Sequence, residues 1–385
     1  MIKRLILFIT ILSNCCFAAE LSLPTVFSDH MVLQRERPVP VWGKADPGAK
    51  VTVEFAGQTK TATVDADGKW RVDLEQLSAS AEPCTLTVSS SDKQIVFQDV
   101  LVGEVWLCSG QSNMQWPMRN TENAQTDMAE AKHPQLRLFN SPRVPAAEPK
   151  ETIDAKWAVC TPETVSNFSG VAYYFGKKLH QDLKVPVGLL LSSWGGTRIE
   201  PWTPPCGFEG IESLADTLKT ALKMPPFSGD QKKDIQIPTA LYNGMIHAHI
   251  PFAIRGAIWY QGESNRQDGM LYVDKTKALL NGWRKLWGCE LPFYFVQIAP
   301  FQYGSDNPGI LPTFWEAQAE IVKVIPKTGM AIVSDCTTIT NIHPPNKEVP
   351  GTRLALLAEA NTYGMNVVST GPGFKTLEKQ DGQLK

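Results

Sequence analysis

The stretch GEVWLCSGQSNM, residues 103–114, joins an apolar run to a polar turn and decides the fold that we expect for most of the chain. Residues 105–108 have the length and composition of a buried strand, and Gly110 is a residue type that ends a strand in a turn. In a parallel sheet, ligands bind beyond the carboxyl ends of the strands. Ser112 is therefore a candidate nucleophile, and a polar cap at a strand end is the alternative interpretation.

Downstream of this stretch, strand patterns alternate with helix patterns. Strands are predicted at 100–108, 136–139, 187–191, 254–260, 293–298 and 330–333, and helices at 122–131, 168–183, 271–287, 313–324 and 351–363. This alternation indicates βαβ units and a mainly parallel sheet with helices on both faces. We expect one three-layer α/β/α domain over residues 100–365, with a Pro- and Lys-rich insertion at about 203–240 that contains a short helix at 211–222.

Residues 20–99 show short strands and turn signals without a helix pattern, which predicts a small all-β sandwich before the α/β domain. Residues 61–64 and 70–74 flank the sequence Asp65-Ala-Asp-Gly68, which favours a hairpin. The tail at residues 366–385 begins with a strand-like stretch at 367–374 and then turns polar. We expect a strand there whose partner element is missing.

The first 19 residues have the layout of a secretory signal peptide. Lys3 and Arg4 precede an apolar run at 5–12, and small residues surround Ala18 and Ala19, where we expect cleavage. The protein is therefore expected to be exported, to the periplasm or the extracellular space. Cys15 and Cys16 raise the alternative of a lipoprotein, which Asn14 disfavours. The apolar run is too short to span a bilayer, so we expect no membrane association after cleavage.

Composition limits the remaining partners. The 385 residues carry 37 Lys and Arg against 39 Asp and Glu, and no basic block suggests a nucleic acid partner. The cysteines outside the signal peptide form no C-x-x-C pair, which argues against a zinc site but leaves one or two disulfides open. His247 and His249 would lie on one strand face without an evident third ligand. We expect neither a metal nor a cofactor, and the oligomeric state stays open.

Four compact polar turns follow predicted strands. They are GQSN at 110–113, SSWGGT at 192–197, QGESN at 261–265 and, after Asp335, TNIHPP at 340–345. Acyl transfer needs a nucleophile, a base within hydrogen-bond reach and donors for a developing oxyanion. Serine, histidine, a glycine N–H and an asparagine amide would supply all of these groups.

The blocks GEVWLCSGQSNM, SSWGGTRIEPW, WYQGESN and NIHPPNK, in this order, resemble the four blocks of the sialate O-acetylesterase family of SGNH hydrolases. The stretch FSDHMVLQRERPVPVWGKADPGAKVTV, residues 27–53, also resembles the N-terminal β domain of that family. The resemblance covers nearly all of the chain after the signal peptide. It implies an SGNH-hydrolase fold, which is flavodoxin-like, and a serine esterase that acts on carbohydrate.

The resemblance also implies roles for individual residues. Ser112 would be the nucleophile and His343 the general base. Gly195 or Gly196, together with the Asn265 side chain and the Ser112 N–H, would form the oxyanion hole. The Gly-Gln-Ser-Asn-Met context differs from the Gly-x-Ser-x-Gly turn of α/β-hydrolases, which disfavours an ordinary lipase.

One position departs from the pattern. Many SGNH enzymes carry Asp three residues before the histidine, to orient the imidazole, whereas this chain has Thr340 there and Asn341 one residue later. We expect a Ser–His dyad in which a backbone carbonyl orients His343. Asp335 or Glu263 could instead reach the imidazole.

The expected reaction is hydrolysis of O-acetyl groups on carbohydrate, with O-acetylated sialic acid as the first choice of substrate. Acetylated xylan or another plant polysaccharide is the alternative substrate. A glycan-binding protein without catalysis is a further alternative, which is favoured by Thr340 at the position where many SGNH enzymes carry an acidic residue. Gln111, Glu263 and Asp335 are candidates for orienting the site or contacting substrate, and Trp116 and Trp202 for stacking on a sugar ring.

Overall fold

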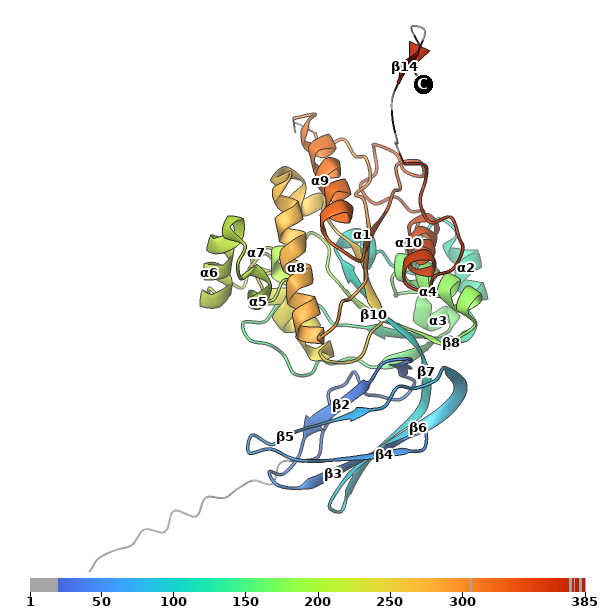
Figure 1. Cartoon of the computed structure of the whole chain (residues 1–385), viewed down its shortest axis with the longest axis vertical. Helices are drawn as coiled ribbons and strands as arrows, with labels where there is room; N and C mark the ends of the chain where they lie inside the picture. The colour runs from blue at the N-terminus through green and yellow to red at the C-terminus, as the bar shows by residue number, and fades with distance from the viewer. Residues whose placement is uncertain (1–19, 305–306, 374–375, 377, 381–382, 385) are drawn as a thin grey trace, which may run out of the picture.

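The computed structural model describes residues 20–304, 307–373, 376, 378–380 and 383–384. The predicted signal peptide at 1–19 lies outside the described residues. A β-rich N-terminal region forms one end of the molecule, and a large sheet covered by helices forms the rest (Figure 1).

The predicted mainly parallel sheet is confirmed. Its strands lie in the order β13-β12-β11-β7-β10-β8-β9, with the bounds β7 Lys93–Gly110, β8 His133–Asn140, β9 Trp157–Cys160, β10 Val187–Ser193, β11 Gly256–Tyr260, β12 Phe293–Val296 and β13 Thr328–Ala331. All neighbours are parallel except β8 and β9. Without β8 and β9, the chain order of the remaining strands is 2-1-3-4-5, the flavodoxin-like order. Strands β8 and β9 extend the edge beside β10.

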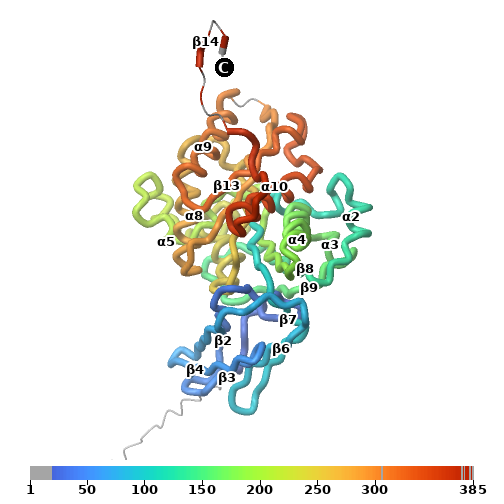
Figure 2. The backbone as a smooth tube through the Cα atoms, turned by 45° about the vertical axis from the view of Figure 1, so that its right-hand side comes forward, coloured from blue at the N-terminus to red at the C-terminus, as the bar shows by residue number. Residues whose placement is uncertain are grey.

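Helices cover both faces of this sheet, as expected (Figures 1 and 2). Helices α4 (Gly170–Leu183) and α10 (Glu348–Asn361) pack on one face, and α8 (Leu271–Trp287) and α9 (Ile310–Val324) pack on the other. Side chains of β7 alternate between the two cores: Val105 and Leu107 join the α8–α9 side, whereas Trp106 and Cys108 join the α4–α10 side. The strand is therefore buried on both faces.

Shorter helices lie in the connections. They are α1 Ser112–Gln115, α2 Ala124–Glu130 and α3 Pro162–Val165 and, in the predicted insertion, α5 Pro205–Phe208, α6 Ala215–Lys223 and α7 Gln231–Asp234. The helix expected at 211–222 begins later than predicted, because residues 212–214 form a 3-10 turn before α6 starts.

The N-terminal region contains β1 Val32–Gln34, β2 Val39–Lys44, β3 Lys50–Phe55, β4 Gln58–Thr63, β5 Lys69–Leu74 and β6 Ser80–Ser90. The predicted hairpin across residues 65–68 is wrong, because β4 pairs with β3 whereas β5 pairs with β2 in a separate sheet. Ala56 and Gly57, with φ of 48° and 78°, form the tight turn that pairs β3 with β4. Asp65 still organises a turn by accepting backbone hydrogen bonds from Asp67 and Lys69, but that turn carries the chain between sheets.

No linker separates the two regions, because β7 is a single 18-residue strand that pairs with β6 in its first half and with β10 and β11 in its second. The predicted boundary at residues 99 and 100 falls inside this strand. Glu104 is fully buried in it and hydrogen-bonds Gln34, Arg35 and Arg255. Burial alone would raise the pKa of Glu104, but Arg255 and Arg35 outweigh burial and hold this pKa below its usual value. That residues 20–99 form a domain of their own stays a prediction.

Two further expectations concern the tail and the cysteines. The strand expected at 367–374 is absent from its described part, since residues 367–373 have no regular structure. A short antiparallel pair, β14 (Lys379–Gln380) and β15 (Gln383–Leu384), follows. The six cysteines in the described part of the chain are free thiols, so no disulfide forms among them. None of the described helices is both long and apolar enough to cross a membrane.

We expect Glu104→Gln to lower the free energy of unfolding by about 3 kcal/mol, because it removes the buried carboxylate of Arg35 and Arg255 and leaves them with the exposed carboxylate of Glu36. Urea denaturation followed by circular dichroism measures this change. Asp216→Asn is the control, since Asp216 pairs with Lys219 on the surface and the change should be within error. A loss at Glu104 as small as at Asp216 would contradict the role of this cluster.

Candidate active site

Three of the four predicted polar turns meet at one edge of the sheet. In the register of the parallel strands, Gly110 of β7 lies opposite Ser193 of β10 and Tyr260 of β11. The turns that follow these strands therefore begin side by side. The fourth turn lies in the loop between β13 and α10 and brings His343 to Ser112.

Gly110 is required by the local geometry. Its φ is 141°, and a Cβ at this position would lie 2.2 Å from the Tyr260 carbonyl oxygen. A side chain would therefore push β7 and β11 apart at their ends. Gln111 then secures the turn: its N–H donates to the Tyr260 oxygen at 2.9 Å, and its Oε1 accepts from the N–H groups of Gly262 and Ser264 at 3.2 and 3.3 Å. Ser112 follows as the first residue of α1.

Ser112 Oγ lies 2.8 Å from His343 Nε2. The imidazole is half-buried and stacks on Trp116, with ring centroids 5.1 Å apart and planes 25° apart. A serine hydroxyl and a neutral imidazole at this distance can pass a proton between them, which is the first requirement of nucleophilic catalysis by serine.

Within the described residues, no carboxylate hydrogen-bonds to the His343 imidazole. Asp335 instead forms two hydrogen bonds of 2.6 Å with Arg353, which lower its pKa to about 2. Glu263 accepts a 2.6 Å hydrogen bond from Asn113. Asn341 accepts the backbone N–H of His343 at 2.9 Å and so shapes the loop, not the ring. Neither carboxylate proposed for the third position occupies it.

A buried network beside the pair was missed in the sequence. Asn113 Nδ2 donates to Glu263 Oε1 at 2.6 Å and to the Ile342 carbonyl at 3.0 Å, and Lys347 Nζ donates to Asn113 Oδ1 at 2.6 Å. These contacts hold Ile342, the neighbour of His343, against Asn113, the neighbour of Ser112. Asn113 and Lys347 both lie inside the blocks GEVWLCSGQSNM and NIHPPNK, which is the signal that could have identified them.

Burial governs the electrostatics of this network. It lowers the pKa of Lys347 to about 7 despite the opposing charge of Glu263, and it raises the pKa of Glu263. Burial, and secondly the positive charge of Lys347, lower the pKa of His343 below its ordinary value. His343 is therefore neutral at neutral pH, which is the form that can accept a proton from Ser112.

The two candidate glycines of the second block differ in their surroundings. A Cβ at Gly195 would lie 3.2 Å from the Ser112 Cβ, whereas a Cβ at Gly196 would have no described atom within 4 Å. The Gly195 N–H donates to Gln115 Oε1 at 2.7 Å. Gly195 is thus the glycine beside Ser112, and its N–H points at an oxygen acceptor.

Asn265 does not fit the expected role of an oxyanion donor, which is a correction to the sequence analysis. The side chain is fully buried, and its amide donates to Glu200 Oε2 at 3.1 Å and to Asp268 Oδ2 at 2.6 Å. Its Oδ1 accepts from the Ile199 N–H and from Gln261. Asn265 therefore fixes the second and third blocks to each other, and its amide is committed to two carboxylates.

Two other expectations are wrong. Trp202 is fully buried, with its indole N–H on Thr197 and its ring edge-on to Trp259, so it is core and not a surface for a sugar. His247 and His249 lie on a 3-10 turn instead of a strand face, and His249 is buried with Nε2 3.0 Å from Ser141 Oγ. Across the described chain, no group of three or more His, Cys, Asp or Glu is placed to hold a metal ion.

A cavity of about 420 Å³ lies beside Gln115. Gln115 and Ser193 line it on the side of the site, and Arg119, Asn167 and Arg143 line it elsewhere. Arg119 is exposed and hydrogen-bonds Asn167. Arg143 is exposed as well and makes no ion pair with a described residue. The cavity therefore offers two guanidinium groups that no carboxylate of the described residues neutralises.

Comparison with known proteins identifies the family of the chain. The model of the family "Carbohydrate esterase, sialic acid-specific acetylesterase" matches residues 102–343. The sialate O-acetylesterases of Rattus norvegicus and Homo sapiens are each 30% identical to the chain, covering 91% of it and 75% and 73% of their own lengths. The crystal structure of a carbohydrate acetylesterase from Xanthomonas citri is 35% identical and superimposes with a TM-score of 0.84, covering 93% of this chain and 79% of that one.

We expect Lys347→Met to move the acid limb of the pH profile of kcat/KM toward higher pH, because the variant removes a positive charge that lowers the pKa of His343. The group that must be deprotonated for activity then titrates at a higher pH, so wild type keeps more of its activity below neutrality than the variant does. The measurement is the rate of hydrolysis of 4-nitrophenyl acetate from pH 4.5 to 8.

Asp335→Asn is the matched control for this profile. It removes a charge in the same loop, but from a carboxylate that pairs with Arg353 and does not contact the imidazole. Its acid limb and kcat should stay those of wild type. A profile altered by Asp335→Asn and left unchanged by Lys347→Met would show that Asp335, and not Lys347, influences the pKa of His343.

Proposed function

The chain belongs to the family of sialic acid-specific carbohydrate acetylesterases and is a carboxylic ester hydrolase, and on that premise we propose that it removes O-acetyl groups from sialic acids with Ser112 as nucleophile. The observation that carries the assignment of the nucleophile is the 2.8 Å contact between Ser112 Oγ and His343 Nε2 at the edge where β7, β10 and β11 end.

The proposed reaction has two steps. Ser112 Oγ attacks the acetyl carbonyl carbon while His343 Nε2 takes the hydroxyl proton, and the ester bond to the sugar breaks as His343 returns this proton to the sugar oxygen. Water then attacks the acetyl-enzyme, His343 takes a proton from it, and acetate leaves as the proton returns to Ser112. No carboxylate is needed to hold the imidazole, because Trp116 stacking and the Asn113 bond to the Ile342 carbonyl fix the ring and its loop.

The oxyanion is proposed to bind the Gly195 N–H and the backbone N–H of Ser112. The Gly195 N–H now donates to Gln115 Oε1 at 2.7 Å, so the carbonyl oxygen of a bound ester would replace an acceptor that is already at the right distance. The displaced Gln115 side chain lines the cavity of about 420 Å³, where the sugar would lie.

Charge in that cavity supports the choice of sialic acid. Guanidinium groups form the strongest hydrogen bonds with carboxylates, and Arg119 and Arg143 line the cavity without a carboxylate partner in the described part of the chain. A sialic acid carries one carboxylate beside its acetylated hydroxyls, whereas acetylated xylan presents a neutral backbone. We further propose export, because residues 1–19 have the pattern of a signal peptide.

Ser112→Ala should lower kcat/KM by on the order of 10⁴-fold for both 4-nitrophenyl acetate and 9-O-acetylated sialic acid, since no other described group lies in its place. Acetate release measured with purified wild type and variant checks this. Wild type no faster than Ser112→Ala on either ester would overturn the esterase assignment and favour a glycan-binding protein.

Arg143→Gln should raise KM for O-acetylated sialic acid by about tenfold, the factor that follows from losing one hydrogen bond to a charged group. KM for acetylated xylo-oligosaccharides and for 4-nitrophenyl acetate should stay unchanged, because neither carries a carboxylate. Equal KM changes for the acidic and the neutral sugar would remove the support for sialic acid, and a wild type that prefers the xylo-oligosaccharide would replace it with xylan.

A further inference from the structure

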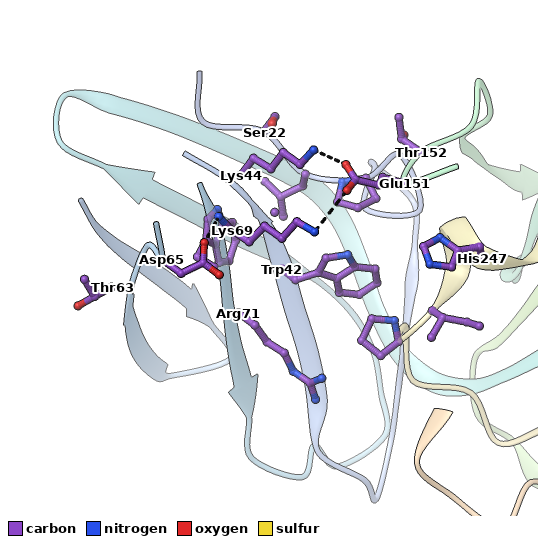
Figure 3. Close-up of a pocket in the computed structure, with 16 residues that line it drawn as sticks. Ser22, Trp42, Lys44, Thr63, Asp65, Lys69, Arg71, Glu151, Thr152 and His247 are labelled. Carbon is purple, nitrogen blue, oxygen red and sulfur yellow. Dashed lines mark hydrogen bonds and ion pairs between the residues drawn. The ribbon is translucent and has the colours of Figure 1, made fainter. Parts of the chain in front are cut away.

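A second cavity, of about 710 Å³, lies where the N-terminal sheets meet the catalytic part of the chain (Figure 3). Strands β2 and β5 form one wall, and Glu151, Thr152 and the segment from His247 to Pro251 form the opposite wall. None of the residues proposed for catalysis lines it. Its volume is in the range of sites that bind small ligands, so its lining chemistry indicates what it would hold.

Trp42 provides a fixed aromatic surface in this cavity. Phe27 packs edge-on against its ring, with centroids 4.8 Å apart and planes at 73°, while the indole stays only partly buried. Figure 3 shows the indole facing the cavity between Lys69 and His247. An aromatic ring held in this way can stack on the apolar C–H face of a pyranose at little entropic cost.

The charged groups around Trp42 neutralise one another. Lys44 and Lys69 both pair with Glu151, the second at 3.7 Å, and Arg71 pairs with Asp73 at 2.7 Å. Asp65 lines the cavity as well, so three carboxylates (Asp65, Asp73 and Glu151) balance the three cations. The cavity thus offers ammonium donors and carboxylate oxygens side by side, and these groups sum to no net charge. A sugar hydroxyl both donates and accepts, so it can bridge such a pair. An uncharged saccharide fits this lining better than an acidic one.

Two chain segments connect this cavity to the cavity beside Gln115. Residues 140–143 line that cavity, and Glu151 lines this one eight residues after Arg143, a span of at most about 28 Å. His247 lines this cavity, and two residues later His249 hydrogen-bonds Ser141, which lines the other. A glycan held in one cavity would therefore raise the effective concentration of its acetylated sugar at the other.

We propose that this cavity binds uncharged pyranose units of the glycan that carries the acetylated sugar, with Trp42 as the stacking surface and Lys44, Lys69 and Glu151 as hydrogen-bond partners. The choice of glycan rests on the proposed function, but the binding itself does not require catalysis.

The experiment is isothermal titration of full-length Ser112→Ala protein with two neutral probes, N-acetyllactosamine and xylotetraose, which represent the neutral parts of a sialylated glycan and of xylan. We expect one probe to bind, and the added change Trp42→Ala to weaken it about tenfold or more. Trp42→Phe, which keeps an aromatic face, should stay within about threefold. Glu151→Gln should also weaken binding, and it tests the site if Trp42→Ala does not fold.

In the active background, Trp42→Ala should leave kcat/KM for 4-nitrophenyl acetate unchanged and raise KM for the acetylated glycan. Failure of the esterase assignment would leave the titration result intact, so the two proposals fail separately. The proposal is overturned if neither probe binds, or if binding is the same in Trp42→Ala, Glu151→Gln and their parent.

Discussion

The continuity of β7 is the constraint on which the rest of the structure depends. One strand of 18 residues pairs with β6 at its start and carries Gly110 at its end, so the N-terminal sheets and the site are registered on the same backbone. Glu104, buried near the middle of this strand, requires Arg35 and Arg255 around it, because an unpaired buried carboxylate is strongly destabilising. Arg35 belongs to the N-terminal region, whereas Arg255 directly precedes β11 of the large sheet. The region before residue 100 therefore stabilises the strand that presents Ser112.

Ser112 and His343 lie 2.8 Å apart although no carboxylate among the described residues bonds to the imidazole. In a triad the acid orients the ring through one side-chain hydrogen bond. Here the orientation comes from the loop instead: Asn113 bonds to the Ile342 carbonyl, and Lys347 bonds to Asn113. Burial, and secondly the charge of Lys347, lower the pKa of His343, whereas a carboxylate bonded to the ring would raise it. The lowered pKa favours the neutral imidazole, which is the form that can accept a proton.

Much of the fold and of the site could be predicted because the signals are local. Apolar runs closed by Gly and polar residues predicted the parallel sheet. The four blocks predicted that Ser112 and His343 lie together, as they do in the structure, while their catalytic roles stay a prediction. The errors concern pairing in space. Residues 65–68 do form a turn, but they do not join a hairpin. The tighter turn at Ala56 and Gly57 pairs β4 with β3 instead. Asn265 follows a strand end as expected, yet Glu200 and Asp268 occupy its amide. Asp268 lies three residues later in the same 3-10 helix, a spacing that brings side chains together, but no spacing rule indicates Glu200, which is 65 residues away.

The two cavities differ in the one property that decides which sugar each can hold. Beside Gln115 the two guanidinium groups pair with no described carboxylate, so an acidic ligand would gain charge-assisted hydrogen bonds there without displacing one of the described ion pairs. Beside Trp42 three carboxylates (Asp65, Asp73 and Glu151) balance Lys44, Lys69 and Arg71, so an acidic ligand would have to compete with Glu151 or Asp73 for its partners. A glycan with an acidic end and a neutral stem meets matching chemistry at both. The charge distribution, and not the volume of the cavities, therefore predicts that the acidic end of such a glycan lies beside Gln115 and its neutral stem beside Trp42.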